Sequence, residues 1–374
     1  MIVKTKLCNV KNKIVKNYFW KKYSGTTSGG NYHNEELLLE YSNTINENMT
    51  YSVEIEKVPQ YNEKHKWVGG QAINSIFYAI PNDSESILIH DTNSNRILPF
   101  GQKGLFKWTG GGIWNDKLYC FPRSANSFLI LDYHTNTIEY LKLDYNYNME
   151  HHYGGIITPD GLAYQPPRNT DHILETDLKT GQSKRIYLSN KYLNMKYRYC
   201  ASVLYPGGYI FFLPERNDKV IKFNYITKKV EYIGETVTPY VFDAKIWIDG
   251  NIYGFSAYTP GMLKIDINLN TVEMIHTGYD FAAYGTKLGI NGKLYSIPGD
   301  GKVVWEFNPK SNELKKLFEI YDDRNAKYAG GATGNDGKIY FSPASADTIM
   351  ILKPNISKIE INSDVYETYY KDFY

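Results

Sequence analysis

The chain has 374 residues, in which 42 Lys and Arg balance 40 Asp and Glu to give a net charge of +2. This balance argues against nucleic acid or a membrane surface as an obligatory partner, and 42% hydrophobic residues exclude a chain that is disordered by composition. No apolar run approaches the ~20 residues of a membrane helix, and the N-terminus lacks the apolar stretch of a secretory signal, so we expect a soluble cytoplasmic protein.

Cysteine and histidine usage predicts no metal site. Cys8, Cys120 and Cys200 show neither a zinc-ligand spacing nor the even number of a disulfide framework. The sequence requires no cofactor, and a divalent metal would be expected only if the chain were a lyase.

The first 63 residues differ from the rest. Residues 1–22 contain seven Lys and no acid, so we expect residues 1–35 to form a solvated basic arm. Within residues 36–63, the segments 37–41 and 50–58 read as strands.

From residue 64 to the end, one sequence motif, called the strand A phrase below, recurs seven times. It has an aromatic residue with two small ones, a tight turn, a second aromatic residue, and a Pro or Ser three residues later; the clearest copies begin at Trp67, Trp108 and Tyr153. The copies end at Pro81, Pro122, Pro167, Pro214, Ser256, Pro298 and Pro343. Ten residues after each end stands a polar residue, in turn Asp91, Asp132, Asp177, Asn224, Asp266, Asn308 and Lys353. Two fixed offsets kept through seven copies indicate a structural repeat.

Each copy reads as four short strands, A to D. Pairs such as Asn291-Gly292 supply the positive φ of the A–B hairpin turn, residues 128–131 are typical of an apolar strand C, and residues 137–141 alternate as an exposed strand D does. Four strands every ~40–50 residues are the signature of a propeller blade. We therefore predict an all-β fold, a seven-bladed β-propeller of four-stranded antiparallel blades over residues 64–374. An N-terminal strand is expected to close the ring on the last blade, and which strand does so stays open.

The repeat resembles the kelch and galactose-oxidase-like propellers over roughly residues 64–362. The segment Gly337 to Tyr340, followed by an apolar strand and a polar turn, carries the resemblance. The double glycine of kelch repeats follows strand B, whereas this chain has Pro there and its double glycine in strand A. The resemblance therefore implies the architecture and not membership of the family.

The faces of the propeller are expected to differ in function. The A–B and C–D turns are short and lie on one face, whereas the D–A connections, such as 143–152 and 189–199, are long and lie with the B–C connections on the other. Long loops on a rigid scaffold are where binding residues concentrate. We expect the D–A/B–C face to be the functional one.

Basic and aromatic residues gather at the ends of strands that reach this face. They predict a cationic, aromatic-rimmed mouth that binds an anionic small molecule, a glycan or a peptide. The candidate ligand-binding residues are Lys66, Trp67, Lys107, Trp108, Arg123, Tyr153, Arg168, Arg198, Arg216 and Lys327. The alternative for each Lys is that its stem packs on the neighbouring ring or that it bonds an adjacent loop.

Two other functions stay open. The chain is an enzyme, a lyase or hydrolase of an acidic substrate, if His151 or His152 acts as the base and Arg123, Arg168 or Arg198 clamps the anion. It is a protein-interaction scaffold if the rim itself is the binding surface. No nucleophile elbow, phosphate loop, zinc-protease helix or dinucleotide fingerprint is present in the sequence.

Overall fold

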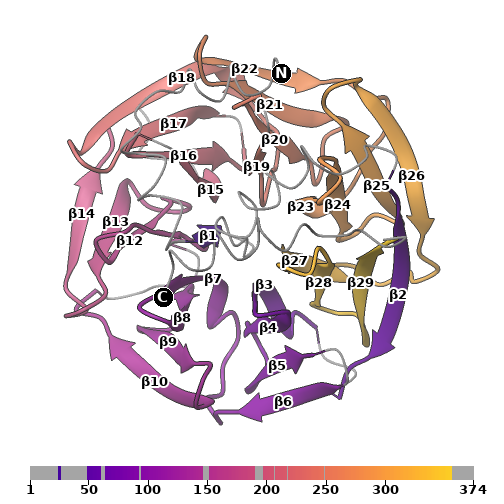
Figure 1. Cartoon of the computed structure of the whole chain (residues 1–374). Helices are drawn as coiled ribbons and strands as arrows, with labels where there is room; N and C mark the ends of the chain where they lie inside the picture. The colour runs from indigo at the N-terminus through magenta and orange to yellow at the C-terminus, as the bar shows by residue number, and fades with distance from the viewer. Residues whose placement is uncertain are drawn as a thin grey trace, which may run out of the picture.

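A computed structural model describes residues 24–26, 49–59, 64–91, 94–145, 151–189, 197–205, 207–216, 218–247 and 249–355. In this part of the chain, seven sheets stand in a ring around one axis and every regular element is a strand (Figure 1). Apart from residues 24–26, the basic arm expected at 1–35 lies outside the described residues, and so does the strand expected at 37–41. No described helix is long and apolar enough to cross a membrane.

The first three blades follow the predicted order A, B, C, D. Blade 1 consists of β3 (Trp67–Ile73), β4 (Ile76–Pro81), β5 (Ser86–His90) and β6 (Asn95–Pro99). Blade 2 consists of β7 (Trp108–Trp114), β8 (Lys117–Pro122), β9 (Ser127–Asp132) and β10 (Thr137–Lys142). Blade 3 consists of β11 (Ile156–Ile157), β12 (Leu162–Gln165), β13 (His172–Asp177) and β14 (Ser183–Tyr187).

The next three blades repeat this order. Blade 4 consists of β15 (Tyr199–Tyr205), β16 (Tyr209–Pro214), β17 (Asp218–Asn224) and β18 (Lys229–Val237). Blade 5 consists of β19 (Lys245–Ile246), β20 (Ile252–Phe255), β21 (Met262–Asp266) and β22 (Thr271–Ile275). Blade 6 consists of β23 (Ala283–Leu288), β24 (Leu294–Pro298), β25 (Val303–Asn308) and β26 (Glu313–Glu319).

Blade 7 takes its outer strand from the other end of the chain. It consists of β27 (Tyr328–Thr333), β28 (Ile339–Pro343), β29 (Thr348–Pro354) and β2 (Tyr51–Lys57). β2 runs antiparallel to β29 from Tyr51 opposite Pro354 to Lys57 opposite Thr348, and Figure 1 shows the indigo β2 beside the yellow β29. The predicted closure by an N-terminal strand is confirmed. A second N-terminal strand, β1 (Ser24–Thr26), pairs with β7 near the centre of the ring.

The polar residues ten positions after each Pro or Ser make the C–D turns. In six blades the side-chain oxygen accepts a backbone N–H two or three residues on, as Asp132 does from His134 and Thr135 at 3.0 and 3.1 Å. Such turns explain the preference for Asp and Asn. The exception, Lys353, is explained by the closure, because blade 7 has no C–D turn to make.

The small residues of strand A allow close backbone approach. A Cβ on Gly331 would lie 1.9 Å from the carbonyl oxygen of Tyr340 in the paired strand, and a Cβ on Gly70 would lie 2.2 Å from the ring of Phe77. Neither position can hold a side chain without displacing strand B. Apolar side chains of strands A to C fill the space between neighbouring blades, so each blade is packed by the next.

Candidate functional site

Three predicted site lysines connect neighbouring blades. Each precedes strand A, is almost completely buried, and donates its ammonium to a carbonyl in the B–C connection of the preceding blade. The bonds run from Lys66 to Ala346 at 2.9 Å, from Lys107 to Asp83 at 3.0 Å and from Lys327 to Asp300 at 3.2 Å. The ammonium of each Lys is therefore engaged at a seam between blades, as the packing alternative expected, and none lines the pocket described below.

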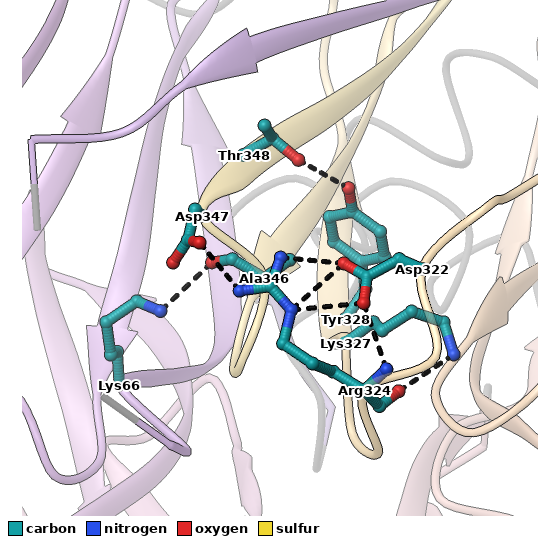
Figure 2. A network of polar contacts seen from close by, with 8 residues as sticks. All are labelled: Lys66, Asp322, Arg324, Lys327, Tyr328, Ala346, Asp347 and Thr348. Carbon is teal, nitrogen blue, oxygen red and sulfur yellow. Dashed lines mark hydrogen bonds and ion pairs between the residues drawn. The ribbon is translucent and has the colours of Figure 1, made fainter. Parts of the chain in front are cut away.

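Figure 2 shows the seam that closes the ring between blades 7 and 1. Beside the bond from Lys66 to Ala346, Arg324 pairs with Asp322 and Asp347, each at 2.7 Å, and its carbonyl accepts a hydrogen bond from Lys327 at 3.0 Å. Both acids are thus engaged by the one guanidinium group of Arg324 within the protein.

The first residue of the strand A phrase points into its blade. Trp67 and Trp108 are fully buried and donate their indole N–H to the carbonyls of Ser86 and Ser127, at 2.7 and 2.8 Å. These tryptophans belong to the core, so we leave them out of the proposed ligand site.

His152, and not Tyr153, occupies the tryptophan position in blade 3. The three equivalent pairings are Trp67 with Pro81, Trp108 with Pro122 and His152 with Pro167. The alignment of Tyr153 with the two tryptophans was wrong by one residue, and one residue along a strand reverses the face of the side chain. Tyr153 therefore points to the face where the guanidinium groups lie.

His152 is buried in an environment that keeps it neutral. It is 0% exposed, its Nδ1 lies 3.0 Å from the Pro166 carbonyl, and burial lowers its pKa to about 3. Its ring contacts those of His151, Tyr145 and His172. Burial also lowers the pKa of the half-buried His151, and neither histidine lines the pocket. In the described part of the chain, no group of three or more His, Cys, Asp or Glu could hold a metal ion.

Arginines and aromatic rings alternate along the D–A/B–C face from blade 2 to blade 5. The D–A side supplies the rings, and the B–C connections supply the guanidinium groups. We call this set the cation–aromatic arc; its order is Phe106, Arg123, Tyr153, Arg168, Tyr197, Arg216 and Tyr240, with 4.4 to 5.7 Å between each guanidinium carbon and the adjacent ring centroids. Cation–π attraction of ~0.5–2 kcal/mol per contact stabilises such stacks.

The three arginines of the arc differ in exposure and partners. Arg168 is buried and makes a bidentate pair with Glu215 at 2.8 and 3.0 Å, so its charge is neutralised within the protein. Arg123 is also buried, whereas Arg216 is exposed. Over the residues that the structure describes, no carboxylate forms an ion pair with Arg216. Arg198 is buried against the ring of Tyr199 and is not part of the arc.

A pocket of about 470 Å³ opens at the Arg216 end of the arc. Its lining residues are Arg168, Tyr197, Glu215, Arg216, Tyr240, Phe242 and Tyr258. Beyond Tyr258, a chain of side-chain hydrogen bonds leads to Tyr284 and then to Asp300. The pocket therefore combines four aromatic walls, one neutralised cation and one exposed cation.

The sequence did not identify four aromatic residues of this site, Phe106, Tyr197, Tyr240 and Tyr258. Phe106 and Tyr197 each directly precede the basic residue before strand A, which was the available signal. Phe106, Tyr197 and Tyr240 have φ of 52°, 57° and 46°, a left-handed conformation that is uncommon for bulky residues. Ala282 and Ala326 have the same positive φ, which shows that the turn before strand A requires this conformation. The aromatic residues Phe106, Tyr197 and Tyr240 of the arc occupy that turn in their blades.

Known proteins resemble the chain in fold only. No family model and no curated protein matches the sequence. Among solved structures, a streptogramin B lyase superposes with a TM-score of 0.66 at 15% identity, over 81% of this chain and 98% of its own. The virginiamycin B lyase of Staphylococcus aureus gives a TM-score of 0.67 at 13% identity, over 81% and 99%.

A protein of a different kind has the same fold. The extracellular domain of a one-component system from B. thetaiotaomicron superposes with a TM-score of 0.61 at 9% identity, over 81% of this chain and 40% of that one. These similar structures are not kelch or galactose-oxidase-like proteins, so the kelch resemblance holds for the architecture alone. The chain is a seven-bladed β-propeller of the shape that these lyases and this extracellular domain share.

Proposed function

We propose that the chain is a ligand-binding β-propeller, and that the pocket at Arg216 holds the anionic group of a small molecule or of a glycan end. Arg216 carries the proposal. It is an exposed cation held between the rings of Tyr197 and Tyr240, with guanidinium-to-centroid distances of 4.9 and 5.7 Å. A guanidinium held in this way presents preorganised N–H donors, and a carboxylate or phosphate accepts two of them at once.

The shape and charge of the pocket support a small ligand. Its volume of about 470 Å³ lies in the range of small-molecule sites, ~300–1,000 Å³. Phe242, Tyr240 and Tyr258 supply apolar walls, and the Arg168–Glu215 pair adds no net charge. A virginiamycin B lyase of the same fold was solved with Quinupristin, so the architecture accommodates small ligands in at least one other protein.

The test compares two anionic sugars with a neutral one. D-glucuronate, glucose 6-phosphate and neutral D-glucose are titrated into the full chain at low salt, with binding followed by calorimetry or NMR. We expect both anions to bind and glucose not to bind. The change Arg216→Ala removes a charge-assisted hydrogen bond of ~1.5–3 kcal/mol, so both anions should bind about 10- to 100-fold more weakly.

The matched control is Arg96→Ala, which removes an exposed arginine from strand β6. It should leave both affinities unchanged. Equal binding of glucose and the anions, or equal effects of the two substitutions, would overturn the proposal. A protein partner captured through Arg216 in the absence of any anion binding would favour the scaffold function instead.

A further inference from the structure

The second polar feature of the pocket is a series of three hydrogen-bonded side chains that ends at the half-buried Asp300. Tyr258 lines the pocket and is 47% exposed, and its hydroxyl is hydrogen-bonded to that of Tyr284. The Tyr284 hydroxyl donates to Oδ2 of Asp300 at 2.8 Å. The other oxygen of Asp300 accepts the backbone N–H of Ala326 at 2.7 Å, which holds the carboxylate in place.

Counting the protons of these three side chains determines which group donates in each hydrogen bond. Burial raises the pKa of Tyr258 and of Tyr284, so each hydroxyl carries one proton at neutral pH. A carboxylate oxygen can only accept, so the proton of Tyr284 is used toward Asp300. The Tyr284 oxygen can then only accept from Tyr258, and the single proton of Tyr258 points away from the pocket.

We infer that Tyr258 is a hydrogen-bond acceptor in the pocket and that it selects an acid which also carries a hydroxyl group, such as an acidic sugar. This inference rests on the proposed function, because Arg216 must hold the acid. The ring of Tyr240 contacts both groups, with its centroid 5.7 Å from the Arg216 guanidinium and 5.1 Å from the Tyr258 centroid.

A sugar acid fits the rest of the pocket as well. Its carboxylate matches the donors of Arg216, and one of its hydroxyls can donate to Tyr258. The C–H faces of its ring pack on Phe242 and Tyr240, where dispersion and removal of apolar surface from water both favour binding. An acid that has only acceptor groups would place an acceptor against the Tyr258 oxygen, with no proton between the two oxygens. A site that accepts a hydrogen bond from its ligand discriminates against a ligand without the donor.

The experiment uses two ring acids that differ in one group. The probe 4-hydroxycyclohexanecarboxylate can donate to Tyr258, whereas 4-oxocyclohexanecarboxylate can only accept. We expect the wild-type chain to bind the hydroxy acid about 3- to 10-fold more tightly, which corresponds to one neutral hydrogen bond. Arg216→Ala should weaken both acids equally.

The substitution Tyr284→Phe tests the direction of the hydrogen bonds from Tyr258 through Tyr284 to Asp300. It removes the acceptor of the Tyr258 proton, and Tyr258 can then turn that proton into the pocket. The preference for the hydroxy acid over the oxo acid should fall to about 1-fold, a change that loss of packing alone would not produce. Tyr258→Phe should abolish the same preference, and Tyr321→Phe, at a hydroxyl on a 95% exposed residue, should preserve it.

The two proposals fail in different ways. If both ring acids bind with equal affinity and still depend on Arg216, the acceptor role of Tyr258 is wrong while the anion site stands. If the hydroxy acid stays preferred in Tyr284→Phe, the assigned direction is wrong. If neither acid responds to Arg216→Ala, the anion site itself is wrong.

Discussion

His152 and Tyr153 are neighbours in the chain, yet they have opposite surroundings. The imidazole of His152 lies inside blade 3 in the place of a tryptophan, while the ring of Tyr153 lies 5.0 Å from the guanidinium carbons of both Arg123 and Arg168. Alternation along a strand causes this difference. A residue type that suits catalysis therefore indicates a site only when the register of its strand is known.

The burial of His152 predicts a pH-dependent stability. Its folded pKa of about 3 lies below the unfolded value of 6.5, so the unfolded chain binds more protons in acid. The stability due to neutral His152 is complete above pH 6.5 and is lost as the pH falls toward 3. At pH 5 the loss is ~2 kcal/mol, at ~1.4 kcal/mol per pH unit below 6.5.

Urea unfolding at pH 7.5 and pH 5 measures this loss. In His152→Leu the difference in unfolding free energy between the two pH values should shrink by about 2 kcal/mol. The exposed His134 provides the control, and His134→Leu should leave the difference as it is in the wild-type chain. An unchanged difference in His152→Leu would contradict the assignment.

Neighbouring blades are joined by lysine side chains that the sequence suggested as ligand-binding residues. A Lys or Arg beside an aromatic residue is typical of an anion site, but Lys66, Lys107 and Lys327 each bond a carbonyl of the preceding blade. These bonds satisfy loop carbonyls that would otherwise be buried without a donor. They repeat because the seam between blades repeats.

The seam between blades 1 and 2 gives the second prediction. Lys107→Met keeps the length of the side chain but removes the donor to the carbonyls of Asp83 and Gly104, at 3.0 and 2.9 Å. Leaving buried acceptors without a donor costs ~1–3 kcal/mol, so the unfolding free energy should fall by about 2 kcal/mol. Lys103→Met, at an exposed residue of the same connection, is the control. If both variants unfold at the same urea concentration, Lys107 does not stabilise the seam.

At the scale of the whole molecule, the ring depends on one strand from the far end of the chain. β2 completes blade 7, and Asn355 donates to Thr50 through both its backbone and its side-chain nitrogen, at 2.9 and 2.8 Å. The end of β29 thus lies beside the beginning of β2. A closed ring leaves no blade with an open face to its neighbour, which is the advantage of closure in propellers.

This adjacency predicts the effect of reordering the chain. A permuted chain of residues 64–355, a short Gly-containing turn, and residues 49–59 should fold as a monomer with one cooperative transition, because β2 then follows β29 as strand D follows strand C elsewhere. A chain of residues 64–355 alone exposes the edge of β29 and should aggregate. Size-exclusion chromatography and thermal unfolding distinguish the two. Equal behaviour of both chains would show that β2 is not needed for closure.

The repeat, the number of blades, the turn residues and closure by an N-terminal strand could be predicted from the sequence, because these depend on local turn chemistry and on the spacing of strands. Which N-terminal strand closes the ring could not be predicted in this way. Lys353, the exception in its series, is explained only by the closure of blade 7 seen in the structure. The sequence also indicated the face of the propeller that carries Arg123, Arg168 and Arg216.

Which basic residues reach the pocket and which connect blades became clear only from the folded ring. Arg216 lies against the ring of Tyr197, whereas Lys107 donates to the carbonyl of Asp83 in the preceding blade. Where a neighbouring blade places its carbonyls, rings and carboxylates therefore decides whether a basic residue faces a ligand or joins two blades. The pairing of Arg168 with Glu215, and the chain from Tyr258 to Asp300, join residues of different blades. Contacts between blades depend on the geometry of the closed ring, which no single repeat of the sequence contains.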